Sequence, residues 1–303
     1  MTNPATRPWT ILLPLIAVLC LAAIWTVYWF VALGMVKDRM ASERSRFAND
    51  GLTLDCSEES WGGYPFHFEW RCSSPVLTRQ TLADARSGDL LLVALAYAPW
   101  QVVALLDGPT TLAGKGIVPV TATHGRIMAA VTLDQDWKPR LSAEIPKLAI
   151  PDLLSVEQTL IHTRPAPGNA TDVAASLTGG IYRRPDRPEL VLDQADLTGT
   201  LLPDPSLAVE RFEFRQGTIR YWGSGSLSLD AEHRVAGTIA TETNDLNGLL
   251  GILGPHLSLT DQQGAGLRTV LGLLGNEAKA DVISRDGQLF VGPFKVYDVP
   301  PFY

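Results

Sequence analysis

The chain contains little charge and almost no cysteine. Only 19% of its 303 residues are Asp, Glu, Lys or Arg, and three are cysteine. The formal net charge is −7, and the basic residues are scattered along the chain. A protein that binds a phosphate backbone needs basic residues gathered on one surface. The composition therefore argues against nucleic acid as a partner, and the length suits one large domain or two small ones.

Motifs that carry catalysis or hold a metal are also missing. The sequence has no His-Glu-x-x-His, no Walker loop and no nucleophile elbow, because Ser224 lies in Trp-Gly-Ser-Gly-Ser with the wrong spacing. Four histidines, His124, His162, His233 and His256, are isolated in the sequence. We therefore predict no enzyme activity and no catalytic, cofactor or metal residues, although a missing motif does not exclude activity.

Charge is absent altogether from residues 8–36. A helix of about 20 apolar residues crosses a hydrocarbon core of roughly 30 Å. Aromatic side chains, which favour the headgroup level, lie at both ends of this stretch: Trp9 at one, and Trp25, Tyr28, Trp29 and Phe30 at the other. A cleaved signal peptide is the alternative, but Ala32-Leu33-Gly34 is a poor cleavage site and lies late. We predict a cytoplasmic tail over residues 1–8 and an uncleaved transmembrane anchor over 9–36.

The orientation of this anchor depends on two opposing observations. Lys37, Arg39, Arg44 and Arg46 follow the helix while only Arg7 and the terminal amine precede it, so the positive-inside count favours a cytoplasmic C-terminal part. The acids interleaved among these residues and the cysteine pair described next favour the opposite orientation. We expect a helical stalk over residues 37–50 and a β-rich domain over 51–303 on the far side of the membrane.

Cys56 and Cys72 are the only cysteine pair outside the anchor, since Cys20 lies within it. Two alternating runs, residues 52–56 and 66–72, place both cysteines on the same apolar face. A turn motif separates the runs: Trp61, Gly62, Gly63, Tyr64, Pro65 and Phe66. A hairpin centred there brings the cysteines opposite each other, and a disulfide would persist in an oxidising compartment such as the periplasm. Two buried free thiols remain the alternative.

Polar residues alternate with the apolar ones in the second run. His67, Glu69 and Arg71 share the face opposite Phe68 and Cys72. A metal or catalytic role is one interpretation, but the usual ligand spacings are missing. We expect this face to be a solvated surface.

Short alternating runs with turns between them continue along the chain. They fall at 126–133, 140–145, 189–194, 209–214, 218–222, 226–230 and 235–241, and near the end at 278–285 and 288–296 around an Asp286-Gly287 turn. Helical spacing interrupts them in two places, at Leu246–Leu253 and from Leu267 to Leu274. The pattern predicts a mainly-β (α+β) domain, built as a curved antiparallel meander sheet with two short helices near the C-terminus.

The most apolar stretch outside the anchor is residues 89–106. Pro99 and Gln101 interrupt it, so we predict a hairpin of buried strands. Residues 90–98 are apolar at both odd- and even-numbered positions, so both faces of this strand are apolar. Something must therefore cover the second face as well as the first. An acyl chain is one candidate. We expect an apolar groove lined by Leu91, Leu92, Val93, Leu95, Tyr97, Leu249, Leu253 and Leu271.

Several of these features together resemble a known family. The anchor, residues 61–66 followed by Cys72, the Gly-Thr-Ile strands, Val291-Gly292-Pro293-Phe294 and Pro300-Pro301 are similar to domain of unknown function 2125, over nearly the whole chain. The resemblance implies an inner-membrane protein of Gram-negative bacteria with a periplasmic domain, and it transfers no catalytic residue. A fainter likeness to AsmA-like envelope proteins implies binding or conduction of lipid.

These observations support competing functions. The leading hypothesis is a binding module in which a β-sheet groove accepts lipid or another hydrophobic ligand. The alternative is a structural or assembly factor of the cell envelope, in which the same apolar surface contacts a protein. An enzyme is the third possibility, and a cluster of polar side chains in one cleft would favour it.

Overall fold

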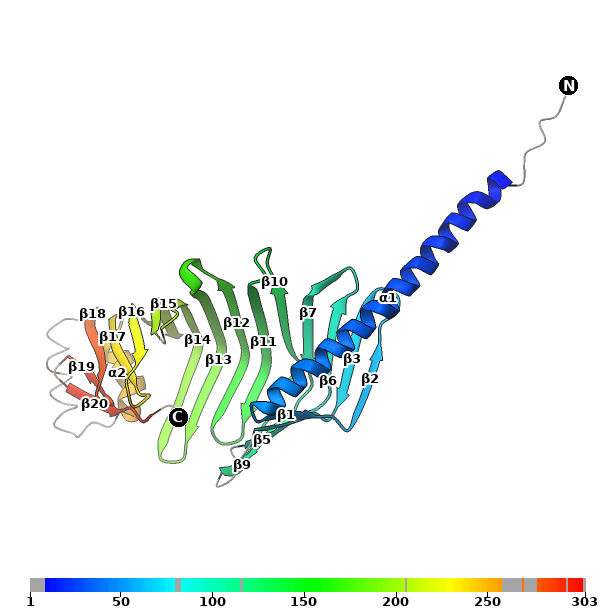
Figure 1. Cartoon of the computed structure of the whole chain (residues 1–303). Coiled ribbons are helices and arrows are strands. Elements are labelled where there is room, and N and C mark those ends of the chain that lie inside the picture. Colours follow the sequence, from blue (N-terminus) through cyan, green and yellow to red (C-terminus); the bar gives the residue numbers. More distant parts are fainter. Residues whose placement is uncertain are drawn as a thin grey trace. The chain divides into compact units, whose positions relative to one another are not determined.

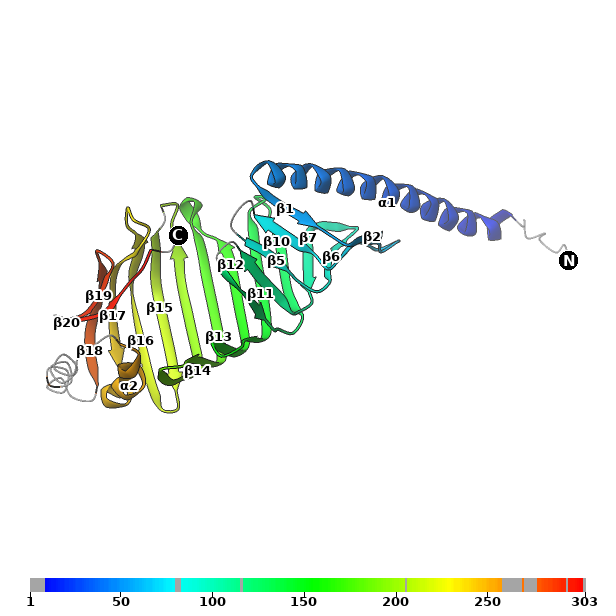
Figure 2. The same cartoon turned by 90° about the horizontal axis from the view of Figure 1, so that it is seen from below.

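The computed structural model describes residues 9–79, 83–114, 117–204, 206–257, 269, 277–292 and 294–301. The chain divides into two compact units, residues 1–104 with 112–119 and residues 105–111 with 120–303. Figures 1 and 2 show the long helix of the first unit and the antiparallel strands of the second.

One helix begins the first unit. Helix α1 runs from Trp9 to Asn49, so the predicted anchor and stalk form one continuous element. Its apolar part is long enough to cross a membrane. The helix ends where predicted, because Gly51 takes a left-handed conformation (φ 81°) and its N–H donates to Ala48 O.

Two groups of strands complete the first unit. In one, β1 (Leu52–Asp55) pairs with β4 (Val76–Arg79), and β4 pairs with β5 (Ala83–Arg86). In the other, β2 (Glu58–Gly62) pairs with β3 (His67–Ser73), and β3 with β6 (Leu90–Leu95). Strands β7 (Ala98–Leu106), β8 (Thr110–Gly114) and β9 (Ile117–Ala122) contribute residues to both units. All four of these strand pairs are antiparallel.

The predicted hairpin is correct in its turn and wrong in its first arm. The partner of β3 is β2, whereas residues 52–55 form β1 and pair with β4. Glu59 is therefore opposite Cys72 in the ladder, and Cys56 lies between β1 and β2. The disulfide Cys56–Cys72 is nevertheless present, with Cα atoms 5.2 Å apart. Closing a loop of this length contributes about 3 kcal/mol on the chain-entropy model.

The second unit is an antiparallel meander. Its strands pair in chain order from β10 to β20, and within the described residues the order does not return to β10. The strands are β10 (Ile127–Leu133), β11 (Pro139–Ile150), β12 (Leu154–Pro165), β13 (Thr171–Arg184), β14 (Arg187–Leu201), β15 (Ser206–Gln216), β16 (Ile219–Leu229), β17 (Val235–Thr243), β18 (Ala278–Arg285), β19 (Gln288–Val291) and β20 (Phe294–Asp298). The mainly-β meander predicted from the sequence is confirmed.

The register of these strands gives the sheet two faces of different chemistry. One row across it is Ser176, Asp196, Glu213, Trp222, Glu242 and Lys279. The neighbouring row is Ala175, Leu197, Phe212, Gly223, Thr241 and Ala280. Because successive residues of a strand point to opposite faces, the two rows lie on opposite faces of the sheet. The first row is mainly polar and the second mainly apolar.

Helix α2 (Leu246–Leu253) covers part of the apolar face. It begins with an Asp245 cap that accepts from Gly248 N, and it buries Leu246 and Leu249 with Ala278 of β18. A 3-10 turn, η2 (Gly254–His256), follows it, and another, η1 (Pro167–Asn169), lies between β12 and β13. Of the second predicted helix, from Leu267 to Leu274, all residues except 269 lie outside the described part of the chain.

Two strand predictions in this unit are wrong in detail. The runs at 218–222 and 226–230 form one strand, β16, in which Gly223 and Gly225 lie mid-strand. A Cβ at either position would clash with the carbonyl oxygens of Ala240 and Thr238 on β17, so close pairing requires glycine there. The run at 288–296 is interrupted at Gly292 (φ 55°) and forms β19 and β20.

Candidate functional site

The first unit packs its sheet against the anchor helix itself. Trp29, Ala32 and Leu33 of α1 are buried together with Phe68 of β3 and Ala96. Their spacing along α1 places them on one side of the helix. This contact covers the even-numbered face of β3 and β6, because Phe68 pairs with Ala94 in the ladder. Part of the cover that the apolar pattern of residues 90–98 requires is therefore protein.

Hydrogen bonds fix this packing. Polar tips of aromatic residues on α1 donate to backbone carbonyls of the sheet, which satisfies both groups where water is partly excluded. The bonds are Trp25 Nε1 to Pro65 O (2.9 Å), Tyr28 OH to Ala96 O (2.8 Å) and Trp29 Nε1 to His67 O (3.2 Å). Thr26 Oγ1 and Tyr64 OH form a further bond of 2.8 Å.

A cavity remains between helix and sheet. Its volume is about 470 Å³, within the range of small-molecule sites. From α1 it is lined by Tyr28, Ala32, Met35, Val36, Arg39 and Met40, and from the strands by Trp61, Phe68, Trp70, Leu92, Val93, Ala94, Pro99 and Val102. Arg39 is the only charged residue in this lining, so the cavity suits a hydrocarbon chain.

A second cavity of about 430 Å³ shares part of this lining. Met40, Trp70 and Leu92 belong to both. The other residues of the second are Glu43, Arg44, Phe47, Leu52, Leu54, Leu77 and Leu90. The two cavities together follow α1 from Tyr28 to Phe47, a rise of about 28 Å at ~1.5 Å per residue.

Arg44 lines the second cavity and contacts both β2 and the disulfide. Its guanidinium donates to Glu59 Oε1 (2.8 Å) and lies 5.0 Å above the ring of Trp70. A weaker contact joins it to Cys56 Sγ (3.6 Å). Burial raises the pKa of Glu59, but hydrogen bonds from Arg44 and Trp70 outweigh this and hold the pKa below its usual value. The Glu59 carboxylate therefore stays ionised at neutral pH.

The residues predicted to line one groove are divided between different places. Leu92 and Val93 line the first cavity, while Leu91, Leu95 and Tyr97 line neither cavity. Leu249 and Leu253 line a hollow of about 150 Å³ beneath α2 in the second unit. Leu271 lies outside the described residues. The described residues of this set that line a cavity therefore do so separately within each unit.

Sequence reasoning missed the contribution of α1 to the site. Met40 and Phe47 stand seven residues apart in an otherwise polar stalk, which is helical spacing. That spacing was the available signal. Within the anchor there was none, because residues 8–36 are apolar on every side of the helix.

The polar side chains on the predicted solvated face of β3 interact with one another. His67 Nε2 lies 2.7 Å from Glu69 Oε1, and Arg71 donates to Glu69 Oε2 (3.2 Å). The hydrogen bond with His67, opposed by burial, lowers the pKa of Glu69. No group of three His, Cys, Asp or Glu side chains in the described part of the chain is arranged to hold a metal ion.

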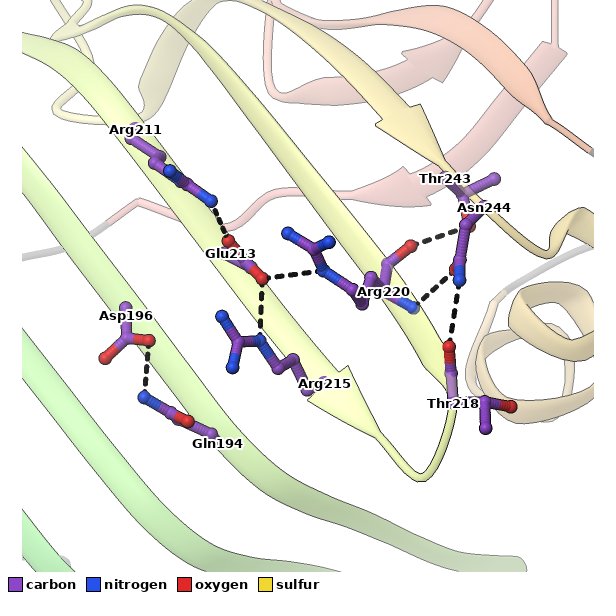
Figure 3. A network of polar contacts seen from close by, with 9 residues as sticks. All are labelled: Gln194, Asp196, Arg211, Glu213, Arg215, Thr218, Arg220, Thr243 and Asn244. Carbon is purple, nitrogen blue, oxygen red and sulfur yellow. Dashed lines mark hydrogen bonds and ion pairs between the residues drawn. The ribbon is translucent and has the colours of Figure 1, made fainter.

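A polar network lies on the second unit's sheet (Figure 3). Glu213 of β15 is buried and accepts from Arg215 (2.7 Å), Arg220 (3.0 Å) and Arg211. Asp196 and Gln194 bond to each other on the neighbouring strand. Because three guanidinium groups occupy the Glu213 carboxylate, this network is suited to hold strands together.

The structure thus defines a class: proteins with one N-terminal helix, apolar enough to cross a membrane, and an open antiparallel β-sheet. A family model described as "Uncharacterized protein conserved in bacteria (DUF2125)" matches residues 29–300. The chain belongs to this family. The match begins within α1, at the first residue buried against the sheet. No curated protein and no solved structure matches the chain.

Proposed function

We propose that this protein is a single-pass inner-membrane protein that binds the acyl chain of a lipid in the first unit, on the periplasmic side. One observation carries the proposal: the apolar cavity begins beside Tyr28 and Ala32, inside the uncharged stretch of α1. An acyl chain leaving the bilayer along α1 would stay in contact with apolar groups. The second cavity extends this path along the stalk, past Met40 to Phe47.

The disulfide supports the periplasmic side. Structural disulfides persist in oxidising compartments and are rare in the bacterial cytoplasm. Cys72 is completely buried in the bridge with Cys56. This argument opposes the positive-inside count of Lys37, Arg39, Arg44 and Arg46.

A topology experiment decides between the two orientations. Alkaline phosphatase fused after Tyr303 is expected to be active, because that enzyme matures only outside the cytoplasm, where disulfides form. The matched control is a cytoplasmic reporter fused at the same residue, which should be inactive. An active cytoplasmic reporter with an inactive phosphatase would reverse the orientation.

The lipid proposal is tested by a pair of adjacent substitutions. Leu92 lines both cavities, whereas Leu91 lines neither, and both lie mid-strand in β6 with similar burial. Leu92→Gln places an unpaired amide in the cavity, at a cost of about 1–3 kcal/mol. We expect Leu92→Gln to bind a fluorescent fatty acid about tenfold more weakly, which corresponds to about 1.4 kcal/mol.

Leu91→Gln is the control and should bind the fatty acid like the unaltered chain. Both proteins carry the same anchor, so lipid bound loosely around α1 cancels in the comparison. A second variant, Ala94→Phe, fills the first cavity without adding a polar group and should also weaken binding. Equal binding by all four proteins would reject the acyl-chain site and leave the assembly-factor hypothesis.

A further inference from the structure

Four exposed aromatic side chains gather at the end of the first unit that contacts the apolar part of α1. They are Tyr64 (52% exposed), Phe66 (64%), Tyr97 (61%) and Trp100 (45%), and we call them the aromatic rim. Tyr64 and Phe66 belong to the connection between β2 and β3, and Tyr97 to the turn between β6 and β7. None of the four lines either of the two cavities of the first unit that we propose to bind the acyl chain.

Contacts within the first unit place these segments beside residues 25–30 of α1. The Tyr64 ring stacks on Phe30 with centroids 6.0 Å apart and lies edge-on to Trp29 at 5.3 Å. Tyr28 OH donates to the carbonyl of Ala96, the residue before Tyr97. These contacts hold Tyr64 and the turn that carries Tyr97 at one level along the helix axis.

That level coincides with the end of the membrane span. A hydrocarbon core of roughly 30 Å takes about 20 helical residues, so a span that starts at Trp9 ends near Tyr28. Neither residues 62–66 nor residues 96–100 include a charged side chain. On α1, Val27, Phe30 and Val31 are exposed at the same level.

We propose that the aromatic rim lies in the headgroup region of the bilayer that α1 crosses. Tyr and Trp favour this region because one end of each ring is apolar and the other is polar. The uncharged composition of both segments fits a lipid surface. The inference rests on the proposed membrane anchor, and its consequence is that the first cavity begins at the membrane surface, where a lipid could enter without crossing water.

The experiment places a fluorescent label at single cysteines of the full chain in phosphatidylethanolamine–phosphatidylglycerol vesicles. The disulfide is kept oxidised, and Cys20→Ser removes the native free thiol. Labels at Phe66→Cys and Tyr97→Cys are expected to lose most of their fluorescence to nitroxide-bearing lipids and little to aqueous iodide. A label at Ala48→Cys, exposed on the same helix about 30 Å beyond Tyr28, should show the reverse.

The unaltered Cys20 separates failure of this inference from failure of the anchor. If lipid quenches a label at Cys20 while labels at residues 66 and 97 behave like the one at 48, the rim faces water and the inference is wrong. Protection of residues 66 and 97 from both quenchers would assign the rim to a protein partner and also overturn it. If a label at Cys20 reports water, α1 does not span the bilayer and both proposals fail.

Discussion

Replacing Trp29 by alanine is expected to detach the first unit's sheet from α1. Trp29 is 3% exposed, packs on Phe68 with ring centroids 5.6 Å apart and donates to His67 O. Removing a buried tryptophan costs about 3–5 kcal/mol, since the cavity it leaves is only partly refilled. The hydrogen bond is lost as well. We expect amide hydrogen exchange in β3 and β6 to accelerate by about 100- to 4,000-fold in the full chain, because each 1.4 kcal/mol is a factor of ten.

A matched deletion controls for the loss of an indole. Trp137 is 74% exposed, so Trp137→Ala removes the same atoms without opening a core. Exchange in β3 and β6 should be unchanged in that variant. Unchanged exchange in the Trp29→Ala protein would show that the sheet is stable without the helix, and the cavity between them would lose its structural basis.

Replacing Glu213 by glutamine is expected to destabilise the second unit by about 2 kcal/mol. Glutamine keeps the shape but removes the charge that three arginines share, leaving them close to one another (Figure 3). Hydrogen bonds to charged groups contribute about 1.5–3 kcal/mol each. The total is smaller than their sum, because the side chains of Arg211, Arg215 and Arg220 are about half exposed to water.

The pH dependence of this stability follows from the pKa of Glu213. Burial raises that pKa, but hydrogen bonds from Arg215, Arg220 and Arg211 outweigh burial and lower it to about 2 in the folded chain. A depressed pKa means that the unfolded chain takes up the proton first. The contribution of Glu213 is therefore complete above about pH 4.5 and is lost as the pH falls toward 2.

Denaturant unfolding between pH 2 and 7 checks this expectation. The unaltered chain should lose more stability across the acidic range than the Glu213→Gln protein. The free energy of unfolding of the variant should therefore fall less steeply with decreasing pH, because it lacks the contribution of the ionised Glu213. Glu210→Gln is the control, because Glu210 is exposed on the same strand and forms no ion pair within the described residues. Parallel curves for the unaltered and Glu213→Gln proteins would show that the arginines do not hold this carboxylate in its charged form.

The sequence by itself determined the features that depend on local pattern. An uncharged stretch over residues 8–36 is enough to specify a long apolar helix, since most of its side chains favour a nonpolar environment and none is charged. Alternation at Phe68, Trp70 and Cys72 is enough to specify a strand with one buried face, and all three side chains are buried. The turns at Gly63 and Asp286-Gly287 and the helix at Leu246–Leu253 were predicted for the same reason.

Strand pairing was determined locally only in part. Neighbouring runs joined by a short turn pair with each other, so the meander of the second unit was predictable. The pairing of β1 with β4 was not, because β2 and β3 separate them in the sequence and both β1 and β2 are near enough to β3 to pair with it. Glycine at residues 223 and 225 is typical of a turn, and only the close approach of β17 explains it within a strand.

Only the tertiary structure decided what lines the candidate site. A helix that is apolar on every side can pack against a sheet at any angle about its axis, so nothing in residues 8–36 singles out Trp29 and Ala32 as the covered side. The same holds for the buried carboxylate, because Glu213 looks like any charged residue of an alternating strand until Arg220 of β16 lies beside it. Local pattern specifies which elements form and which residues avoid water, whereas the partners of those residues depend on contacts between segments distant in the chain.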